Sequence, residues 1–150
     1  MSAMNLVLVV QRKLKASPER LFDAWTKPEL LMKWFHAGEK MNTSQAETDL
    51  RVGGAWSLTM DHADVNERRV TRGKYLVLER PTKLVLTWIP CLRDYETKVT
   101  LSFKGLSDGY TEMTLTHEGL RDGDFQGHQE GWDEILGTLS NWLVQERLGS

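Results

Sequence analysis

The sequence predicts an α+β fold: a curved antiparallel sheet of about six to seven strands wrapped around one long C-terminal helix, with two short helices after the first strand. Three observations lead to this prediction. The hydrophobic pattern of the 150 residues changes period twice, from helical spacing near the N-terminus to alternation through the middle and back to helical spacing. The alternating strands need a cover for their apolar face. Only the last predicted helix, roughly 30 Å long, can provide it.

The N-terminal part is predicted to hold one strand and the two short helices. Residues 6–15 are apolar and then alternate, which is typical of a strand entering a sheet. Ser17 followed by Pro18 indicates a helix start, because serine caps helix N-termini and proline is favoured at the first helical position. Pro28 ends this helix, since the residue before a proline disfavours helical backbone angles. A second helix is expected over about 28–34.

Strand patterns occupy the middle of the chain. Residues 46–52 alternate and predict a strand that ends at the glycine pair 53–54. The next strand is expected to turn Trp56, Leu58 and Met60 toward one face.

Two further strands are expected before the strongest alternation begins. One covers residues 70–78 and is expected to be interrupted at Gly73, and the polar segment 61–67 before it is expected to be a loop. The other covers residues 84–89, which are apolar on both faces, so this strand should lie centrally or under a covering element.

A hairpin and the long helix complete the predicted fold. Asp108-Gly109 predicts the hairpin turn, because this pair tolerates positive φ. Asp124 is expected to cap a helix of roughly twenty residues that ends near Gly149. The two strands of the hairpin are each expected to turn one face inward. These faces carry Val99, Leu101 and Phe103 on the first strand and Met113, Leu115 and His117 on the second. The helix carries the apolar stripe Trp132, Ile135, Leu136, Leu139, Trp142 and Leu143.

Composition excludes several classes of protein. A net charge of −2 gives no footprint for nucleic acid, and no segment approaches the ~20 apolar residues of a membrane span. The single Cys91 cannot form an internal disulfide, and no set of side chains has metal-ligand spacing. We therefore expect one domain over residues 1–150, cytoplasmic, with no metal or cofactor. Homodimerisation is possible through sheet edges or the short helices.

A series of short segments, spread over nearly the whole chain, resembles one known family. The sequence is similar to bacterial proteins related to the activator of heat shock protein 90 ATPase, in the START and birch-pollen-allergen-like (SRPBCC) superfamily. The matching segments are Ala16–Trp25, Trp34-Phe35, Val52–Trp56, Gly73–Tyr75, Arg80-Pro81, Leu86–Trp88, Leu115–Leu120 and Gly131-Trp132.

The resemblance implies a helix-grip fold with a cavity between the sheet and the C-terminal helix. It implies less about chemistry, because such folds host carriers, cyclases, hydroxylase subunits and co-chaperone domains. The eukaryotic activator also has a separate N-terminal domain that has no counterpart in this sequence. A chaperone partner is therefore not expected.

The leading functional hypothesis is non-covalent binding of a small hydrophobic ligand, aromatic or lipid-like. An empty cavity of ~300 Å³ would cost ~7 kcal/mol, so the pocket must be small, wet, collapsible or filled. For each predicted residue, simple core packing is the alternative interpretation. The predicted pocket residues are Trp34, Phe35, Trp56, Leu58, Met60, Tyr75, Trp88, Leu101, Phe103, Met113, Leu115, His117, Trp132, Leu136 and Leu139.

Two alternatives to simple binding stay open. An enzyme of the cyclase, dehydratase or hydrolase type would use the same pocket, with His117 as the acid or base. His117 and His62 both lie near predicted strand ends, where a side chain usually reaches solvent. A chaperone-associated stress role is the third possibility and follows from the family resemblance alone.

Overall fold

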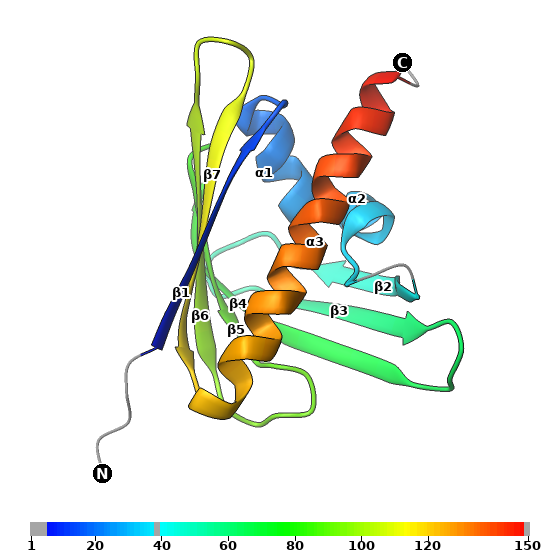
Figure 1. The fold of residues 1–150 in the computed structure, drawn as a ribbon. Helices are drawn as coiled ribbons and strands as arrows, with labels where there is room; N and C mark the ends of the chain where they lie inside the picture. The colour runs from blue at the N-terminus through cyan, green and yellow to red at the C-terminus, as the bar shows by residue number, and fades with distance from the viewer. Residues whose placement is uncertain (1–5, 38–39, 149–150) are drawn as a thin grey trace.

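The computed structural model describes residues 6–37 and 40–148, and these form seven strands and three helices (Figure 1). The two short helices after the first strand and the long final helix confirm the predicted fold class. The elements are β1 (Leu6–Leu14), α1 (Pro18–Thr26), α2 (Pro28–Trp34), β2 (Met41–Thr48), β3 (Ala55–His62), β4 (Arg68–Glu79), β5 (Lys83–Trp88), β6 (Thr97–Gly105), β7 (Thr111–Leu120) and α3 (Asp122–Leu148).

All described strands form one antiparallel sheet in the order β1-β7-β6-β5-β4-β3-β2. Only β1 pairs with a strand that is distant in sequence. Register shifts in the β1–β7, β2–β3 and β4–β5 pairs mark irregularities of the kind that bend strands. Figure 1 shows the result: the sheet curves strongly, and α3 runs across its concave side. This is the arrangement of a helix-grip fold.

The two short helices form as the sequence predicts. The Ser17 hydroxyl oxygen accepts a hydrogen bond from the Arg20 backbone N–H at 3.1 Å, which confirms the N-cap. Pro28 begins α2, as expected. α1 contacts β6, whereas α2 contacts β2 and α3. Together they close one end of the space between sheet and long helix.

The strand predicted over residues 46–52 is wrong beyond Thr48. β2 lies earlier, over Met41–Thr48, and the following residues form a turn. Leu50 and Val52 are 49% and 68% exposed, so their alternation does not reflect a buried face. Gly53, with φ +85°, reverses the chain here, and its N–H donates to the Tyr75 carbonyl oxygen at 2.8 Å.

The predicted interruption at Gly73 is also wrong, because β4 runs through it without a break. The glycine instead permits a close approach between strands. A Cβ atom built there would lie 1.9 Å from the Thr87 carbonyl oxygen and 2.8 Å from Trp56 Nε1. Only a residue without a side chain fits between these two groups.

The long helix differs from the prediction at its start. α3 begins at Asp122 and has 27 residues, so Asp124 is inside its first turn and is not the N-cap. The Asp124 carboxylate instead accepts hydrogen bonds from Arg93 at 3.0 Å and from the Tyr95 hydroxyl. The predicted apolar stripe from Trp132 to Leu143 is buried, as expected. Gly149, where the helix was expected to end, lies outside the described residues.

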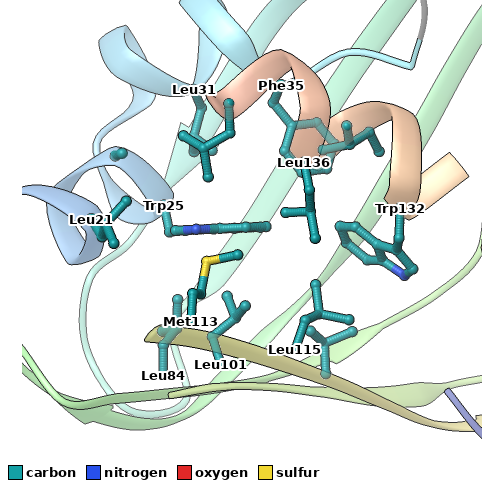
Figure 2. Packing of buried hydrophobic residues seen from close by; sticks show 14 of the residues in the cluster. Leu21, Trp25, Leu31, Phe35, Leu84, Leu101, Met113, Leu115, Trp132 and Leu136 are labelled. Atoms are coloured by element: carbon teal, nitrogen blue, oxygen red, sulfur yellow. The ribbon is translucent and has the colours of Figure 1, made fainter. Parts of the chain in front are cut away.

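One hydrophobic cluster fills the space between the sheet and the helices. In Figure 2, Leu84, Leu101, Met113 and Leu115 rise from the strands toward the helices. α3 approaches from the other side. The inward faces predicted for β6 and β7 are therefore confirmed.

Candidate functional site

Five aromatic side chains, which we call the aromatic cluster, meet where α1, α2 and α3 face the middle of the sheet. The ring centroids of Trp88 lie 5.1 Å from Trp56 and 5.0 Å from Trp132. Phe35 lies 6.2 Å from Trp88 and 6.1 Å from Trp132. Trp25 completes the cluster at 6.2 Å from Trp132, and Figure 2 shows these two rings extending from different helices toward each other. These tilted and edge-on contacts are the geometries that aromatic rings prefer.

The aromatic cluster borders a space of about 20 Å³, which we call the core cavity. This volume admits about one water-sized group, so the core cavity is far smaller than a typical ligand site of ~300 Å³ or more. Seven of its lining residues were predicted from the sequence: Phe35, Trp56, Leu58, Tyr75, Trp88, Leu101 and Trp132.

Five lining residues of the core cavity were missed by the sequence prediction. Trp25 and Leu31 lie on the buried faces of the short helices, whose helical spacing was visible in the sequence. Leu86 pairs with Val99 across β5 and β6, so their inward parity was also a usable signal. Thr48 was missed because a polar residue at the end of a strand carries no such signal.

The remaining predicted residues lie elsewhere. Met60 lines a groove at the surface and does not line the core cavity. The other seven are buried and do not line the cavity: Trp34, Phe103, Met113, Leu115, His117, Leu136 and Leu139. Burial alone therefore did not identify which inward residues border open space.

A groove of about 370 Å³ opens at the surface beside the core cavity, and we call it the surface groove. It runs between β3, β4, the segment after β5 and the first turns of α3. Trp88 and Trp132 line the groove and the core cavity alike, so their rings separate the two spaces. The groove is lined by Met60, Arg69, Thr71, Trp88, Cys91, Arg93, Gly123, Asp124, Gly127, His128, Gly131, Trp132 and Ile135.

Three glycines leave the α3 side of the surface groove with few side chains. Gly123, Gly127 and Gly131 are spaced four residues apart, which places them on one side of the helix. A Cβ atom built at any of them meets no atom within 4 Å. Larger side chains would therefore fit the backbone, but they would occupy the groove.

His117 is buried on the inward face of β7, as predicted, and its ring holds Trp132 in place. The Trp132 indole N–H donates to His117 Nδ1 at 3.0 Å. Because an indole nitrogen can only donate, Nδ1 must be the acceptor and Nε2 carries the hydrogen. Nε2 then donates to Thr97 Oγ1 at 2.7 Å, and this hydroxyl donates to the Trp88 carbonyl oxygen at 2.6 Å.

This network leaves His117 without a free nitrogen. Burial, and to a smaller degree the neighbouring His128, lowers the pKa of His117 to about 3. The ring is therefore neutral near pH 7. It could act as a base only after breaking its bond to Trp132, so its evident role is to position the two tryptophans of the shared wall.

The other reactive groups of the surface groove are also restrained. Burial raises the pKa of the Cys91 thiol, which disfavours the thiolate needed for nucleophilic attack. The Tyr95 hydroxyl and the Arg93 guanidinium lower the pKa of Asp124. His62 lies at the end of β3, outside the groove lining, and its Nδ1 accepts from the Asp64 backbone N–H at 3.1 Å.

Two classes of site are not found in the described part of the chain. Residues 6–37 and 40–148 contain no group of three or more His, Cys, Asp or Glu side chains that could hold a metal ion. Within the same residues, no helix has the length and apolar character to cross a membrane.

Residues 15–143 match the family model described as Activator of Hsp90 ATPase homolog 1-like protein. No curated protein sequence matches the chain significantly.

Several solved structures share the fold. The AHSA1 protein from Silicibacter pomeroyi superposes with a TM-score of 0.80 at 24% identity, over 94% of this chain and 99% of that one. An HSP90 activator from Plasmodium falciparum gives 0.74 at 23% identity, over 93% and 96% of the two chains. A protein from Nitrosomonas europaea gives 0.80 at 24% identity, over 95% and 97%.

Proposed function

Because the chain belongs to the Activator of Hsp90 ATPase homolog 1-like family, whose fold is of a ligand-binding type, we propose that it binds a small hydrophobic or aromatic molecule. The ligand lies in the surface groove and places an apolar part against the aromatic cluster. The binding is non-covalent.

The main support for this proposal is that the core cavity and the surface groove share two lining residues, Trp88 and Trp132. The core cavity alone is too small for a ligand, whereas the groove, at about 370 Å³, has the volume of a small-molecule site. Among the residues that the structure describes, only Trp88 and Trp132 line both spaces. A modest displacement of either ring would join the two spaces and extend the groove into the core.

The chemistry of the site favours binding over catalysis. Both nitrogens of His117 are occupied, and its pKa of about 3 keeps it neutral. The Cys91 thiol has a raised pKa. With His117 and Cys91 set aside, the main feature of the site is the flat surface of its aromatic side chains, which can pack against apolar molecules.

The experiment uses a leucine to fill the groove. At Gly127 an added Cβ atom meets no atom within 4 Å, so we expect Gly127→Leu to keep the fold while its side chain takes up volume in the groove. The control is Gly137→Leu, on the same helix but outside the groove lining, where a Cβ also meets no atom. Both variants gain helix propensity equally.

Binding of an environment-sensitive dye, 1-anilinonaphthalene-8-sulfonate, is followed by its emission, and apolar test compounds are scored by displacing it. We expect Gly127→Leu to weaken binding at least about tenfold, equivalent to 1.4 kcal/mol, and Gly137→Leu to bind as the wild type does. Equal binding by all three proteins would refute the groove as the site. A wild type that binds neither the dye nor any apolar compound would refute the function.

A second candidate function is association with an Hsp90-type chaperone. The family description and the fold shared with the HSP90 activator from Plasmodium falciparum favour it. An ATPase assay of Hsp90 with and without the protein tests this candidate, and an unchanged rate over a range of concentrations would exclude it.

A further inference from the structure

The surface groove is not only apolar, because two arginines and one aspartate are among its lining residues. Arg93 is committed to the aspartate, since its Nη2 donates to Asp124 Oδ1 at 3.0 Å. The Tyr95 hydroxyl donates to the same carboxylate. The other arginine, Arg69, therefore has no anion of its own among the described residues that line the groove.

Arg69 lies on the inward, concave face of the sheet. It is paired with Met60 across β3 and β4, and two residues further along these strands Thr71 is paired with Leu58. Directly opposite residues share a face, and faces alternate along a strand, so Arg69 is on the face of Leu58, which is buried in the core. Inward charges can protect an edge strand, but β4 lies between β3 and β5, so this explanation does not apply.

The ion pair that Arg69 forms within the protein holds it only weakly. Its Nε donates to Glu67 Oε1 at 3.1 Å, and Nη2 lies 3.1 Å from the same oxygen. The side chains of Arg69 and Glu67 are 46% and 38% exposed, and ion pairs as exposed as this contribute little to stability. A guanidinium has five N–H donors, so this contact leaves donors available for a second carboxylate.

The charges around Cys91, which lines the same groove, also favour an anion. Burial raises the pKa of the Cys91 thiol, and among the charged groups that act on it Arg69 has the largest effect, which lowers the pKa. Glu67 and Arg93 have smaller effects of opposite sign. The electrostatic influence on this part of the groove is therefore positive on balance.

The apolar part of the groove begins beside Arg69 and extends to the two tryptophans. Met60, opposite Arg69, lines the groove, as do Trp88 and Trp132. A strand rises about 3.3 Å per residue, so the four steps from Arg69 to Gly73, which lies against the residue before Trp88, span roughly 13 Å. One small molecule can thus contact the guanidinium at one end and the aromatic rings at the other.

We propose that the ligand is an ionised carboxylic acid with an apolar body, whose carboxylate pairs with Arg69 while its body lies over Met60 and reaches Trp88 and Trp132. This inference rests on the proposed function and narrows its ligand class from any small apolar molecule to an organic acid. Because Arg69 is partly exposed, the bound carboxylate keeps part of its hydration, and the cost of burying a charge is small.

The test compares two compounds of nearly the same shape, 2-naphthylacetate and 2-naphthylacetamide, of which only the first is charged at pH 7. Both are scored by displacing N-phenyl-1-naphthylamine, a neutral dye that makes no ion pair. The measured quantity is Kd for the amide divided by Kd for the acid, followed from wild type to variant at constant ionic strength. This double comparison cancels the difference in hydration between the compounds and any change in the apolar site that affects both.

Arg69→Gln removes the proposed anchor, and Arg68→Gln is the matched control. Arg68 is the next residue of β4, on the opposite face, where it pairs with Asp61 at 3.1 Å and does not line the groove. Both variants lose one positive charge, so a general electrostatic effect would be equal in the two. We expect the ratio to fall about five- to tenfold in Arg69→Gln, as for the loss of one charge-assisted hydrogen bond, and to stay within about twofold in Arg68→Gln.

A third variant, Glu67→Gln, removes the carboxylate that competes for Arg69 and should raise the ratio about twofold. A lower ratio in this variant would count against the inference. An unchanged ratio in Arg69→Gln, or an equal fall in Arg68→Gln, would overturn it.

The same measurements separate the two proposals. If the wild type binds the neutral dye and the amide but not the acid, and Gly127→Leu weakens dye binding, the inference fails and the proposed function stands. If the wild type binds neither dye and neither naphthalene compound, both proposals fail.

Discussion

Two regions of the same hydrophobic core are both buried but are built differently. The aromatic cluster leaves the core cavity between its rings and keeps two indole N–H groups without an acceptor. The second region, which we call the aliphatic region, is fully buried and borders neither the core cavity nor the surface groove. It consists of Leu21, Leu84, Met113, Leu115, Leu136 and Leu139.

The difference reflects the shapes of the side chains. Leucine and methionine have several rotatable bonds and can fill irregular gaps, which fits the finding that no residue of the aliphatic region lines the core cavity or the surface groove. Indole rings are flat and rigid, and several of them meeting at tilted angles leave a gap. We infer that the aliphatic region contributes mainly stability, whereas the aromatic cluster gives up some packing for a site that can accept a ligand.

Truncation in the aliphatic region should have the largest effect. In Leu136→Ala the lost side chain leaves a cavity in a closely packed environment, and we expect the free energy of unfolding to fall by about 2–5 kcal/mol. Urea denaturation at pH 7 measures it. The control is Val144→Ala on the exposed side of the same helix, for which a change below about 1 kcal/mol is expected. A loss that small in Leu136→Ala would show that the aliphatic region is not closely packed.

Acid should weaken the aromatic cluster specifically, because its wall depends on neutral His117. The pKa of His117 is near 6.5 in the unfolded chain and about 3 in the folded protein. Above pH 6.5 neither state binds the proton, so the stability from this group is fully present. As the pH falls below 6.5, the unfolded chain takes up a proton that the folded protein excludes. The free energy of unfolding should therefore drop, by about 3 kcal/mol at pH 4, with the loss complete near pH 3.

Urea denaturation of the wild type and of His117→Gln at several pH values isolates this contribution, because carboxylates titrate equally in both proteins. The wild type should lose more stability between pH 7 and pH 4 than the variant does. Parallel pH profiles would show that His117 does not carry the buried neutral role assigned to it.

The smallest changes in the free energy of unfolding are expected when a leucine is replaced by phenylalanine in each region. This pair of variants compares the packing of the aliphatic region directly with that of the aromatic cluster. Leu115→Phe enlarges a side chain in the aliphatic region and should cost about 1–3 kcal/mol through overpacking. Leu86→Phe makes the same change beside the core cavity, which offers some space, so we expect a cost below about 1 kcal/mol. Thermal unfolding of both variants measures the difference, and equal costs would mean that the core cavity offers no usable space.

Most of the fold could be predicted from local patterns. The cap at Ser17 and the turn at Gly109, whose φ is +82°, are confirmed because they depend on neighbouring residues. The errors at Val52, Gly73 and Asp124 share a cause: in each case a distant group decides the local structure. The Tyr75 carbonyl holds the turn at 53, the Thr87 carbonyl requires glycine at 73, and Arg93 engages Asp124.

The candidate site was less predictable than the fold. The alternation around Trp56 and the helical spacing around Trp132 predicted that both face inward, and both line the core cavity. These patterns could not separate them from Leu115 or Leu136, which face inward as well but line neither the core cavity nor the surface groove. The alternation of β7 did predict that His117 faces inward, but no local pattern indicates that it accepts a hydrogen bond from Trp132.

The amino-acid sequence thus determines which helices and strands form, their order along the chain and the faces that they bury, because periodicity, caps and turns act over a few residues. Where open space remains, and which indole N–H groups lack an acceptor, depends on how rings from α1, α3 and β5 meet. Those segments are far apart in sequence, and a gap between them follows from their three-dimensional packing, which no local pattern encodes.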